Sequence, residues 1–301
     1  PLVNASIDQT VCGNNNTVFL NGSVSGASST GIWTSIGTGT FTPNNTTLNS
    51  TYVPSATEIS SGSTKLILTS TLNGICGLAR DTMQVTITPV PTASIAATSV
   101  SVCANNPTLT VSGTIGGITT TGKWTTTGSG SFNPSNILLS TNYLPSAADL
   151  LAGQVKLYLS STNNGNCNQA KDSLLVFFTS PPNVNAGTNI SICKNNPITV
   201  LAGVITGPTT TGVWAGGTGT FTPNNTVLTA TYIPTAAEIA AGVVNLSLTS
   251  TLNGNCNQVS DNVLINFTNP PSVNAGVNLA ICKNNSSAVL SGIISGTTTT
   301  G

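Results

Sequence analysis

The stretch that decides the fold lies at residues 231–242 and reads Thr-Tyr-Ile-Pro-Thr-Ala-Ala-Glu-Ile-Ala-Ala-Gly. Copies of it lie at 51–62 and 142–153, and each copy has a Tyr, a Pro, an acidic residue and a final Gly at the same places. Recurrence at a fixed period is the signature of a modular array. The chain therefore consists of tandem copies of one unit.

Other landmarks recur in the same register around this stretch. Each complete copy opens with a Cys-x-Asn-Asn motif, places a Trp 21 residues after that cysteine, continues with Gly-x-Gly-[Thr/Ser]-Phe-x-Pro and has a second cysteine before its last strand. The opening cysteines are Cys12, Cys103, Cys193 and Cys282, the tryptophans are Trp33, Trp124 and Trp214, and the second cysteines are Cys76, Cys167 and Cys256.

Prolines separate the copies and make short, stiff joints. They predict three repeats at 1–90, 91–181 and 182–270, and the N-terminal part of a fourth at 271–301. Because the sequence begins and ends within the pattern, we expect it to belong to a longer protein.

Within each repeat, apolar and polar residues alternate over short runs bounded by Gly, Asn and Pro, which is the period-two pattern of half-buried strands. In the last run of the first repeat, for example, Met83, Val85 and Ile87 share one face. About seven strands with a single Trp near the third are typical of an immunoglobulin-like sandwich. We therefore predict an all-β fold of tandem immunoglobulin-like sandwiches of about 90 residues, with the tryptophans in their cores.

The opening stretch also predicts one short helix in each repeat. Its Ser or Thr lies three residues before an acidic residue, which is the spacing of a capping box, and the final Gly is a typical C-terminal cap. The pairs are Ser55 with Glu58, Ser146 with Asp149, and Thr235 with Glu238. We expect a helix of one or two turns that crosses between the two sheets.

Composition excludes several classes of function. Charged residues make up 5% of the chain, with seven Lys and Arg against seven Asp and Glu, and there is no His. No basic run is present to neutralise phosphates, and no apolar run approaches the roughly 20 residues of a membrane span. We expect no nucleic-acid partner and no membrane insertion in this segment.

The same composition argues against catalysis. Without His the chain lacks the commonest catalytic base and transition-metal ligand. One set of carboxylates is assigned to the helix caps, and the other, Asp81, Asp172 and Asp261, occurs once per repeat at the start of the last strand. A glycosidase needs two carboxylates about 5 to 10 Å apart in one cleft. We therefore predict no enzyme, no catalytic or metal-binding residues and no cofactor.

Two cysteines at fixed places in each repeat indicate disulfides and an oxidising, extracellular setting. Pairing within a repeat would join Cys12 to Cys76, Cys103 to Cys167, and Cys193 to Cys256. Geometry favours another scheme. With seven strands the first and last run in the same direction, so the two cysteines of one repeat lie at opposite ends, roughly 30 Å apart. A disulfide needs α-carbons within about 7 Å.

The first cysteine of one repeat would instead face the second cysteine of the next. This scheme pairs Cys12 with Cys167 and Cys103 with Cys256, and it leaves the partners of Cys76, Cys193 and Cys282 outside the sequence. Because the number of strands is itself inferred, pairing within each repeat stays open as the alternative.

These motifs resemble the tandem repeats of giant Bacteroidetes cell-surface adhesins of the SprB gliding-motility type. The resemblance covers the whole chain and rests on Val-Asn-Ala-Gly at 184–187 and 273–276, Cys-Lys-Asn-Asn-Pro at 193–197, Thr-Phe-Thr-Pro-Asn-Asn-Thr at 220–226, the opening stretch at 231–242 and Gly-Asn-Cys at 254–256. It implies export by the type IX secretion system to the outer surface of a bacterial cell. It also implies a filament that binds the substratum and is driven by the cell-surface motility machinery.

Bacteria of this group attach O-glycans at Asp-[Ser/Thr]-apolar motifs, so the resemblance implies candidate sites at Thr82 and Ser173. We predict a structural repeat region, the shaft of a secreted adhesin filament, with extracellular surfaces or polysaccharide as partners. The alternative is a glycan-binding module whose weak sites act through avidity.

Overall fold

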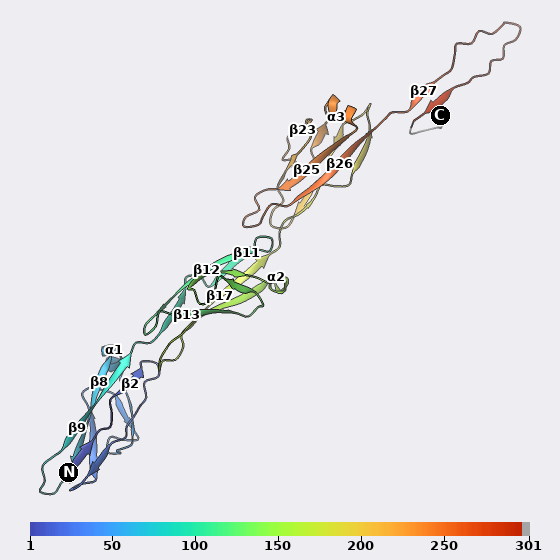
Figure 1. The fold of residues 1–301 in the computed structure, drawn as a ribbon. Coiled ribbons are helices and arrows are strands. Elements are labelled where there is room, and N and C mark those ends of the chain that lie inside the picture. Colours follow the sequence, from blue (N-terminus) through green and yellow to red (C-terminus); the bar gives the residue numbers. More distant parts are fainter. Residues whose placement is uncertain (297–301) are drawn as a thin grey trace. The chain divides into compact units, whose positions relative to one another are not determined.

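The computed structural model describes residues 1–296 (Figure 1). The chain forms two compact units, of which the first contains 1–101 and 108–177, and the second contains 102–107 and the chain from 178 onward. In the described residues every sheet is built from strands of one sequence repeat.

The first repeat is a sandwich of short strands. One face carries the sheet β2-β9-β8-β5, and the other carries the sheet β3-β7-β6 and the pair β1-β4. The strands are β1 (Leu2–Asn4), β2 (Gln9–Cys12), β3 (Val18–Phe19), β4 (Ser23–Ser25), β5 (Thr30–Ser35), β6 (Thr40–Thr42), β7 (Thr51–Val53), β8 (Ser63–Thr71) and β9 (Arg80–Thr88).

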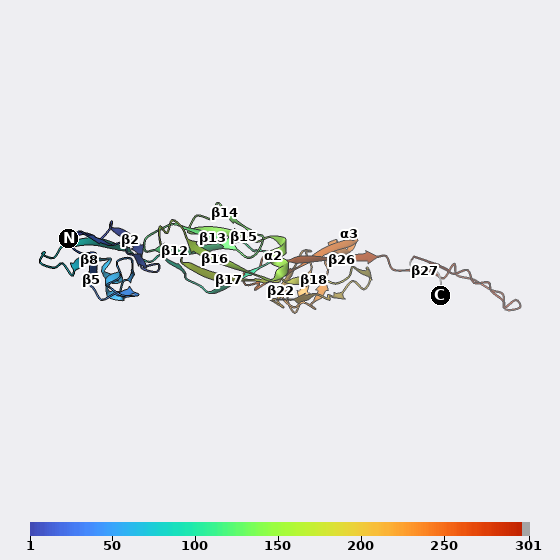
Figure 2. The ribbon, with the colours of Figure 1, turned by 90° about the horizontal axis from the view of Figure 1, so that it is seen from below.

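The second repeat has the same plan, with sheets β10-β12-β15-β14 and β11-β17-β16-β13. Figure 2 shows β13, β16 and β17 side by side. The strands are β10 (Thr92–Ile95), β11 (Ser99–Cys103), β12 (Leu109–Gly116), β13 (Gly122–Thr126), β14 (Ser131–Asn133), β15 (Ser140–Leu144), β16 (Gln154–Ser161) and β17 (Lys171–Thr179).

The third repeat forms the sheets β19-β26-β25-β22 and β20-β24-β23 and the pair β18-β21, and beyond it β27 pairs with β28. The strands are β18 (Asn183–Asn185), β19 (Ile190–Cys193), β20 (Thr199–Val200), β21 (Val204–Thr206), β22 (Gly212–Ala215), β23 (Thr220–Thr222), β24 (Thr231–Ile233), β25 (Val243–Ser250), β26 (Ser260–Thr268), β27 (Ser272–Asn274) and β28 (Ile293–Ser295).

The beginning of each repeat switches from one sheet to the other. In the first repeat β1 pairs antiparallel with β4, and β2 then pairs in parallel with β9, which places Cys12 opposite Thr88. The third repeat pairs β19 with β26 in the same way, with Cys193 opposite Thr268. The parallel register therefore brings the opening cysteine to the end of the sandwich from which the chain leaves for the next repeat.

Each core is centred on its tryptophan, since Trp33, Trp124 and Trp214 have no exposed surface. The indole N–H of Trp33 donates to the carbonyl of Leu48 at 3.1 Å, so its polar atom is satisfied inside the core. The main chain of Trp33 also exchanges two hydrogen bonds with Asn45. Burial of so large a side chain is a major contribution to the stability of a small sandwich.

The predicted helices are present as α1 (Ala56–Ser61), α2 (Ala147–Ala152) and α3 (Ala236–Ala241). All three begin with a complete capping box and end at a glycine with positive φ, such as Gly62 at 77°. α1 connects β7 of one sheet to β8 of the other, as expected of a crossing helix. Among residues 1–296, no helix combines the length and the apolar character needed to traverse a bilayer.

Candidate functional site

Two disulfides join the sequence repeats. Cys12 is bonded to Cys167 and Cys103 to Cys256, with α-carbons 5.0 Å apart in both pairs. Each bond therefore connects the first cysteine of one repeat to the second cysteine of the next, and the alternative pairing within a repeat is not formed. Within the described residues Cys76, Cys193 and Cys282 form no disulfide.

Asparagine side chains surround the Cys12–Cys167 bond and make what we call the clasp. The side chains of Asn14 and Asn168 each bind the main chain of the other residue. The side-chain amide of Asn14 donates to the Asn168 carbonyl at 3.2 Å and accepts from the Asn168 main-chain N–H at 3.0 Å. The side-chain amide of Asn168 donates to the Asn14 carbonyl at 2.8 Å. The Asn15 amide donates to the Asn166 carbonyl, and the Asn166 amide donates to the Thr10 carbonyl. The clasp thus joins two loops more than 150 residues apart in the sequence.

A similar arrangement, with four of the five hydrogen bonds, surrounds the Cys103–Cys256 bond in the second unit. Asn105 and Asn257 exchange the same three hydrogen bonds, at 3.1, 3.0 and 2.6 Å, and Asn106 donates to the carbonyl of Asn255 at 3.2 Å. The repetition follows from the sequence, because both joints bring together a Cys-x-Asn-Asn loop and an Asn-Cys-Asn hairpin. The Asn-Asn pairs after Cys12 and Cys103 therefore close the two joints, a role that the sequence alone does not reveal.

Burial protects the Cys12–Cys167 bond on both sides. Cys12 has no exposed surface and Cys167 is 9% exposed, whereas in the other bond Cys103 is buried and Cys256 half-buried. The Thr88 hydroxyl lies 3.5 Å from the Cys167 sulfur and adds a polar contact. A reductant therefore has to open the first joint before it can reach the sulfur atoms of Cys12 and Cys167.

A second recurring cluster lies inside each repeat, where the helix cap meets the tyrosine of the opening stretch. The Tyr52 hydroxyl donates to Glu58 Oε1 at 2.6 Å, and Tyr143 and Tyr232 bind Asp149 and Glu238 in the same way at 2.7 Å. The tyrosines have no exposed surface and the carboxylates are at most 9% exposed. The sequence assigned these carboxylates to a local cap, and the structure adds the buried phenol as a partner.

This cluster also explains the Gly-x-Gly segments that the sequence presents before each Phe-x-Pro. A β-carbon at Gly37 would clash with the Glu58 carboxylate, and one at Gly39 would clash with the Tyr52 hydroxyl. The N–H of Gly39 donates to that hydroxyl at 3.1 Å. The two glycines therefore allow the main chain to approach the buried acid and phenol, which no larger residue permits.

The pKa values of the buried carboxyl group and of the tyrosine in each cluster lie outside their usual ranges. Burial by itself raises a carboxyl pKa, but the hydrogen bonds from Thr64, Tyr52 and Ser55 outweigh it and lower the pKa of Glu58 to about 2. The pKa values of Asp149 and Glu238 are lowered for the same kind of reason. Burial and the adjacent carboxylate raise the pKa of each of the three tyrosines to about 12. The acid is therefore an ionised hydrogen-bond acceptor at neutral pH, not a proton donor.

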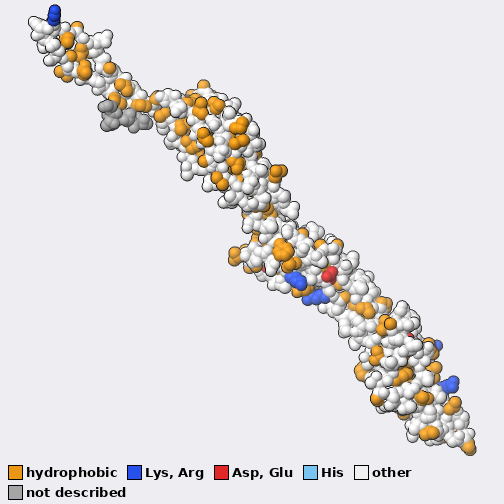
Figure 3. Space-filling model, turned by 180° about the vertical axis from the view of Figure 1, so that it is seen from behind, with side chains coloured by type: hydrophobic (Ala, Val, Ile, Leu, Met, Phe, Trp, Pro, Cys, Tyr) orange, Lys and Arg blue, Asp and Glu red, His pale blue; other side chains and the backbone are white. Residues whose placement is uncertain are grey.

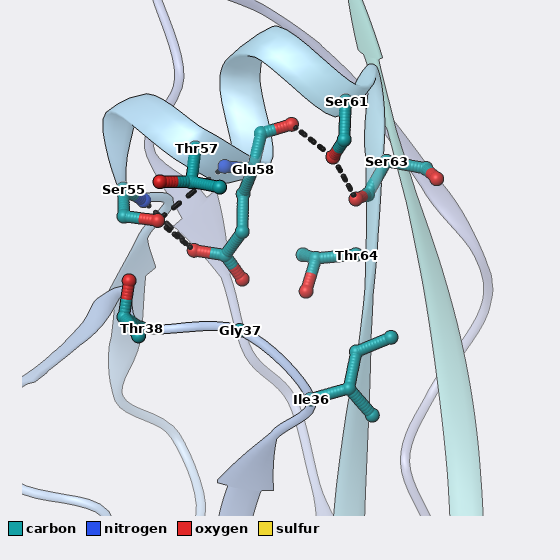
Figure 4. Close-up of a pocket in the computed structure, with 9 residues that line it drawn as sticks. All are labelled: Ile36, Gly37, Thr38, Ser55, Thr57, Glu58, Ser61, Ser63 and Thr64. Carbon is teal, nitrogen blue, oxygen red and sulfur yellow. Dashed lines mark hydrogen bonds between the residues drawn. The ribbon is translucent and has the colours of Figure 1, made fainter.

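A pocket of about 330 Å³ lies over α1 in the first repeat (Figure 4). Figure 4 shows the Glu58 carboxylate pointing toward Ser55, with Thr64 close by. Hydroxyl groups dominate the lining, which consists of Ile36, Gly37, Thr38, Ser55, Thr57, Glu58, Ser61, Ser63 and Thr64. Both carboxylate oxygens already accept hydrogen bonds from Ser35, Tyr52 and Ser55. The pocket therefore contains a saturated acid, which suits structure better than acid–base chemistry.

The other set of acidic residues ties the first strand to the last. Asp81 accepts from the N–H of Ala5 at 2.8 Å, and the other repeats have the corresponding bonds from Ile95 to Asp172 at 2.7 Å and from Ala186 to Asp261 at 2.9 Å. These residues lie at the start of the last strand, as predicted, but their role was not predicted. The sequence feature that pointed to a structural role is that one such Asp occurs at the same position in each of the three repeats.

The two candidate glycosylation residues lie on the last strand of their repeats. Thr82 is exposed on β9, directly after Asp81, and Ser173 is half-buried on β17 beside Tyr158. The ring of Tyr158 also lies 3.6 Å below the ammonium of Lys171. Both stay predicted modification sites.

Charge is sparse over the molecule. The face in Figure 3 is mostly white, with scattered apolar side chains and few charged ones. Within residues 1–296, no three His, Cys, Asp or Glu side chains gather closely enough to hold a metal ion. The recurring polar groups are instead the asparagines of the clasps and the hydroxyls around the helix caps.

No known protein-family model matches this chain, and neither does any curated protein sequence. Solved structures of tandem domains are similar to it. Three titin domains share 13% identity over 87% of this chain and 95% of their own, with a TM-score of 0.48. Three mouse cadherin-23 repeats share 11% identity over 88% of this chain and 96% of their own, with a TM-score of 0.39. Five Sidekick-1 immunoglobulin domains share 13% identity over 89% of this chain and 59% of their own, with a TM-score of 0.35.

The fold is immunoglobulin-like. The strand order of each repeat carries this assignment, with four-stranded sheets such as β2-β9-β8-β5 packed over a buried tryptophan. Each immunoglobulin-like repeat adds a short helix between its sheets.

Proposed function

We propose that the chain is a load-bearing section of a secreted filament, the shaft of a bacterial cell-surface adhesin that serves attachment and gliding. The observation that carries the proposal is the overlap of the two disulfides. Cys103 lies inside the loop closed by Cys12 and Cys167, and Cys167 lies inside the loop closed by Cys103 and Cys256. The loops interlock along the sequence, with separations of 155 and 153 residues.

Interlocked loops limit how far an unfolded repeat extends under force. Between Cys12 and Cys256 the shortest covalent route crosses both disulfides and follows only the main chain between Cys103 and Cys167. At about 3.6 Å per residue this route spans roughly 24 nm, against roughly 88 nm for the reduced chain. A filament built in this way stays short and connected even when single repeats unfold.

The extracellular setting is supported by the same bonds, because disulfides persist in oxidising compartments. The low charge leaves the proposed shaft without a strong electrostatic field to attract charged macromolecules. Export by the type IX system, association with the outer membrane and contact with motility machinery are parts of the proposal that rest on the resemblance of the repeats to gliding adhesins.

Single-molecule force spectroscopy tests the proposed shaft function. The 301-residue chain is stretched from its two ends, first oxidised and then with reductant present. The reduced chain should gain roughly 65 nm of contour length, because the residues hidden behind the two bonds are released. A chain with all seven cysteines replaced by serine is the control and should respond identically with and without reductant. Equal contour lengths for the oxidised and reduced chains would contradict the proposal.

A second candidate function, glycan binding, is favoured by the hydroxyl-lined pocket of the first repeat. Thr57, Ser61 and Thr64 of this pocket correspond to Ala237, Ala241 and Val244 in the third repeat. The third repeat therefore has apolar side chains where the first repeat has hydroxyl groups. This difference favours one glycan site in the first repeat over identical sites that act through avidity. A glycan array probed with the whole chain and with Thr57→Ala tests this candidate, and binding that is unchanged by the substitution would exclude this pocket.

A further inference from the structure

The hairpins that carry the second cysteines share one backbone but differ in the side chains around the cysteine. Asparagine flanks the cysteine on both sides at Cys167 and at Cys256, whereas Ile75 and Gly77 flank Cys76. The backbone of the turn is the same in all three. Residues Leu72, Asn163 and Leu252 have φ of 54°, 55° and 54°, and the cysteine N–H donates to the Asn three residues earlier at 3.1, 3.0 and 3.1 Å.

The flanking asparagines supply a distinct part of the clasp. Asn168 donates its amide to the carbonyl of Asn14, and Asn166 donates to the carbonyl of Thr10 at 3.0 Å. The remaining three bonds, in which the Asn14 and Asn15 side chains bind the main chain of 166 and 168, need no particular side chain on the hairpin. A hairpin with Ile and Gly at these places keeps the three main-chain bonds and loses the two side-chain donors.

The hairpin of the first repeat lacks both side-chain donors. Ile75 is fully exposed and has no polar atom with which to meet a carbonyl, and Gly77 has no side chain at all. The opening loops are nearly uniform in contrast, because Cys12, Cys103, Cys193 and Cys282 are all followed by Asn-Asn after one variable residue. The side chains that distinguish one joint from another therefore belong to the hairpin around the second cysteine, not to the Cys-x-Asn-Asn loop.

We propose that the asparagines on either side of the second cysteine are the specificity determinants of the joint. Asn168 and Asn257 donate to the carbonyl of the first asparagine in a Cys-x-Asn-Asn loop, and Asn166 adds a bond to the residue two before Cys12. These bonds hold the two thiols in register for oxidation. The hairpin with Ile75 and Gly77 is the weaker partner for the same kind of loop. This inference goes beyond the shaft function and does not depend on it, since it concerns which loops dock and how firmly.

Thiol–disulfide exchange measures this docking directly. Two glutathione thiols reduce the Cys12–Cys167 bond to two cysteine thiols and leave as one molecule of glutathione disulfide. Hydrogen bonds that survive in the reduced joint hold the thiols close together and shift this equilibrium toward the protein disulfide. The equilibrium constant for each bond therefore reports the strength of its own clasp.

The test transplants the first-repeat hairpin into the second. The full chain with Asn166→Ile and Asn168→Gly is equilibrated in glutathione buffers, alkylated and mapped by mass spectrometry. Loss of two hydrogen bonds should make Cys12–Cys167 at least tenfold easier to reduce, which is about 30 mV. The Cys103–Cys256 bond in the same molecule is the internal control and should not change.

The mirror variant Asn257→Gly removes the amide donor to the Asn105 carbonyl, so it should move the effect to Cys103–Cys256 and leave Cys12–Cys167 as in the wild type. Gln169→Ala is the matched control, because Gln169 is exposed on the same hairpin but donates to Ser161 within its own repeat. The single variant Asn168→Gly, which removes one donor, should give an intermediate shift and serves if a double variant folds poorly. Constants that stay within twofold of the wild type, or two bonds that shift together, overturn the proposal.

Discussion

The acid–tyrosine cluster and the asparagine clasp both recur from repeat to repeat, but they hold the molecule together by different physics. The cluster lies inside a repeat, where Tyr52 and Glu58 are buried and the acid is ionised. The clasp lies at the end of a repeat, where exposed asparagines surround a buried disulfide. Cohesion within a repeat therefore depends on protonation and packing, whereas cohesion between repeats depends on the redox state.

The largest expected effect on stability comes from removing the disulfide at the centre of a clasp. Replacing Cys12 and Cys167 by Ser removes a cross-link that spans 155 residues, and the loop-entropy limit for such a bond is about 5 kcal/mol of unfolding free energy. Denaturant unfolding of the first unit should shift to markedly lower denaturant. The control Cys76→Ser should leave the midpoint unchanged, and an unchanged midpoint in the double variant would show that the bond adds no stability.

Acid should act on the three clusters at once and leave the disulfides intact. The folded pKa of Glu58, about 2, lies below the unfolded value of about 4, so its stabilisation is complete above about pH 4.5 and is lost as the pH falls through about 2. The tyrosines have the opposite sign: their stabilisation is complete below about pH 10 and is lost as the pH rises through about 12.

Because the chain contains no His, we expect an unfolding free energy that is nearly level between about pH 5 and pH 9. Denaturant titrations across the pH range measure this profile. A steep change near pH 6 to 7 would contradict the assignment of the clusters as the principal titrating elements.

A smaller effect is expected from a single cluster. Tyr232→Phe removes the donor to Glu238 and the acceptor for the N–H of Gly219, and it leaves a buried charge short of a partner. The loss should be about 2 kcal/mol. Hydrogen exchange of the β25 amides measures this loss locally. The matched control is Tyr158→Phe, because Tyr158 is half-buried and its replacement should cost under about 0.5 kcal/mol. Equal effects of the two substitutions would remove the distinction between cluster and surface tyrosines.

The smallest effect belongs to a contact outside both regions. Lys171→Met removes the ammonium that lies 3.6 Å from the Tyr158 ring and should cost about 0.5 to 1 kcal/mol. Hydrogen exchange of β16 and β17 measures the loss, with Lys123→Met as the comparison on an exposed strand position. A cost above that of Tyr232→Phe would contradict the expectation that the buried cluster contributes more than this surface contact.

Local and periodic features were predicted correctly from sequence. The alternation around Met83, the capping box of Ser55 and Glu58 and the buried position of Trp33 all depend on neighbours within a few residues or on one recurring register. Such signals survive without knowledge of the fold because strand period, helix capping and the burial of a large apolar ring are properties of short segments.

The sequence by itself therefore determined that this chain is a series of immunoglobulin-like sandwiches with a capped helix in each repeat, and strand direction favoured disulfides between repeats. Only the tertiary structure decided the partners across the fold: Asp81 with Ala5, Tyr52 with Glu58 inside the sandwich, and Asn14 with Asn168 around the disulfide. The physical reason is separation. Asn14 and Asn168 are 154 residues apart, and no local preference of either asparagine specifies the carbonyl that the packed repeats bring within hydrogen-bonding distance.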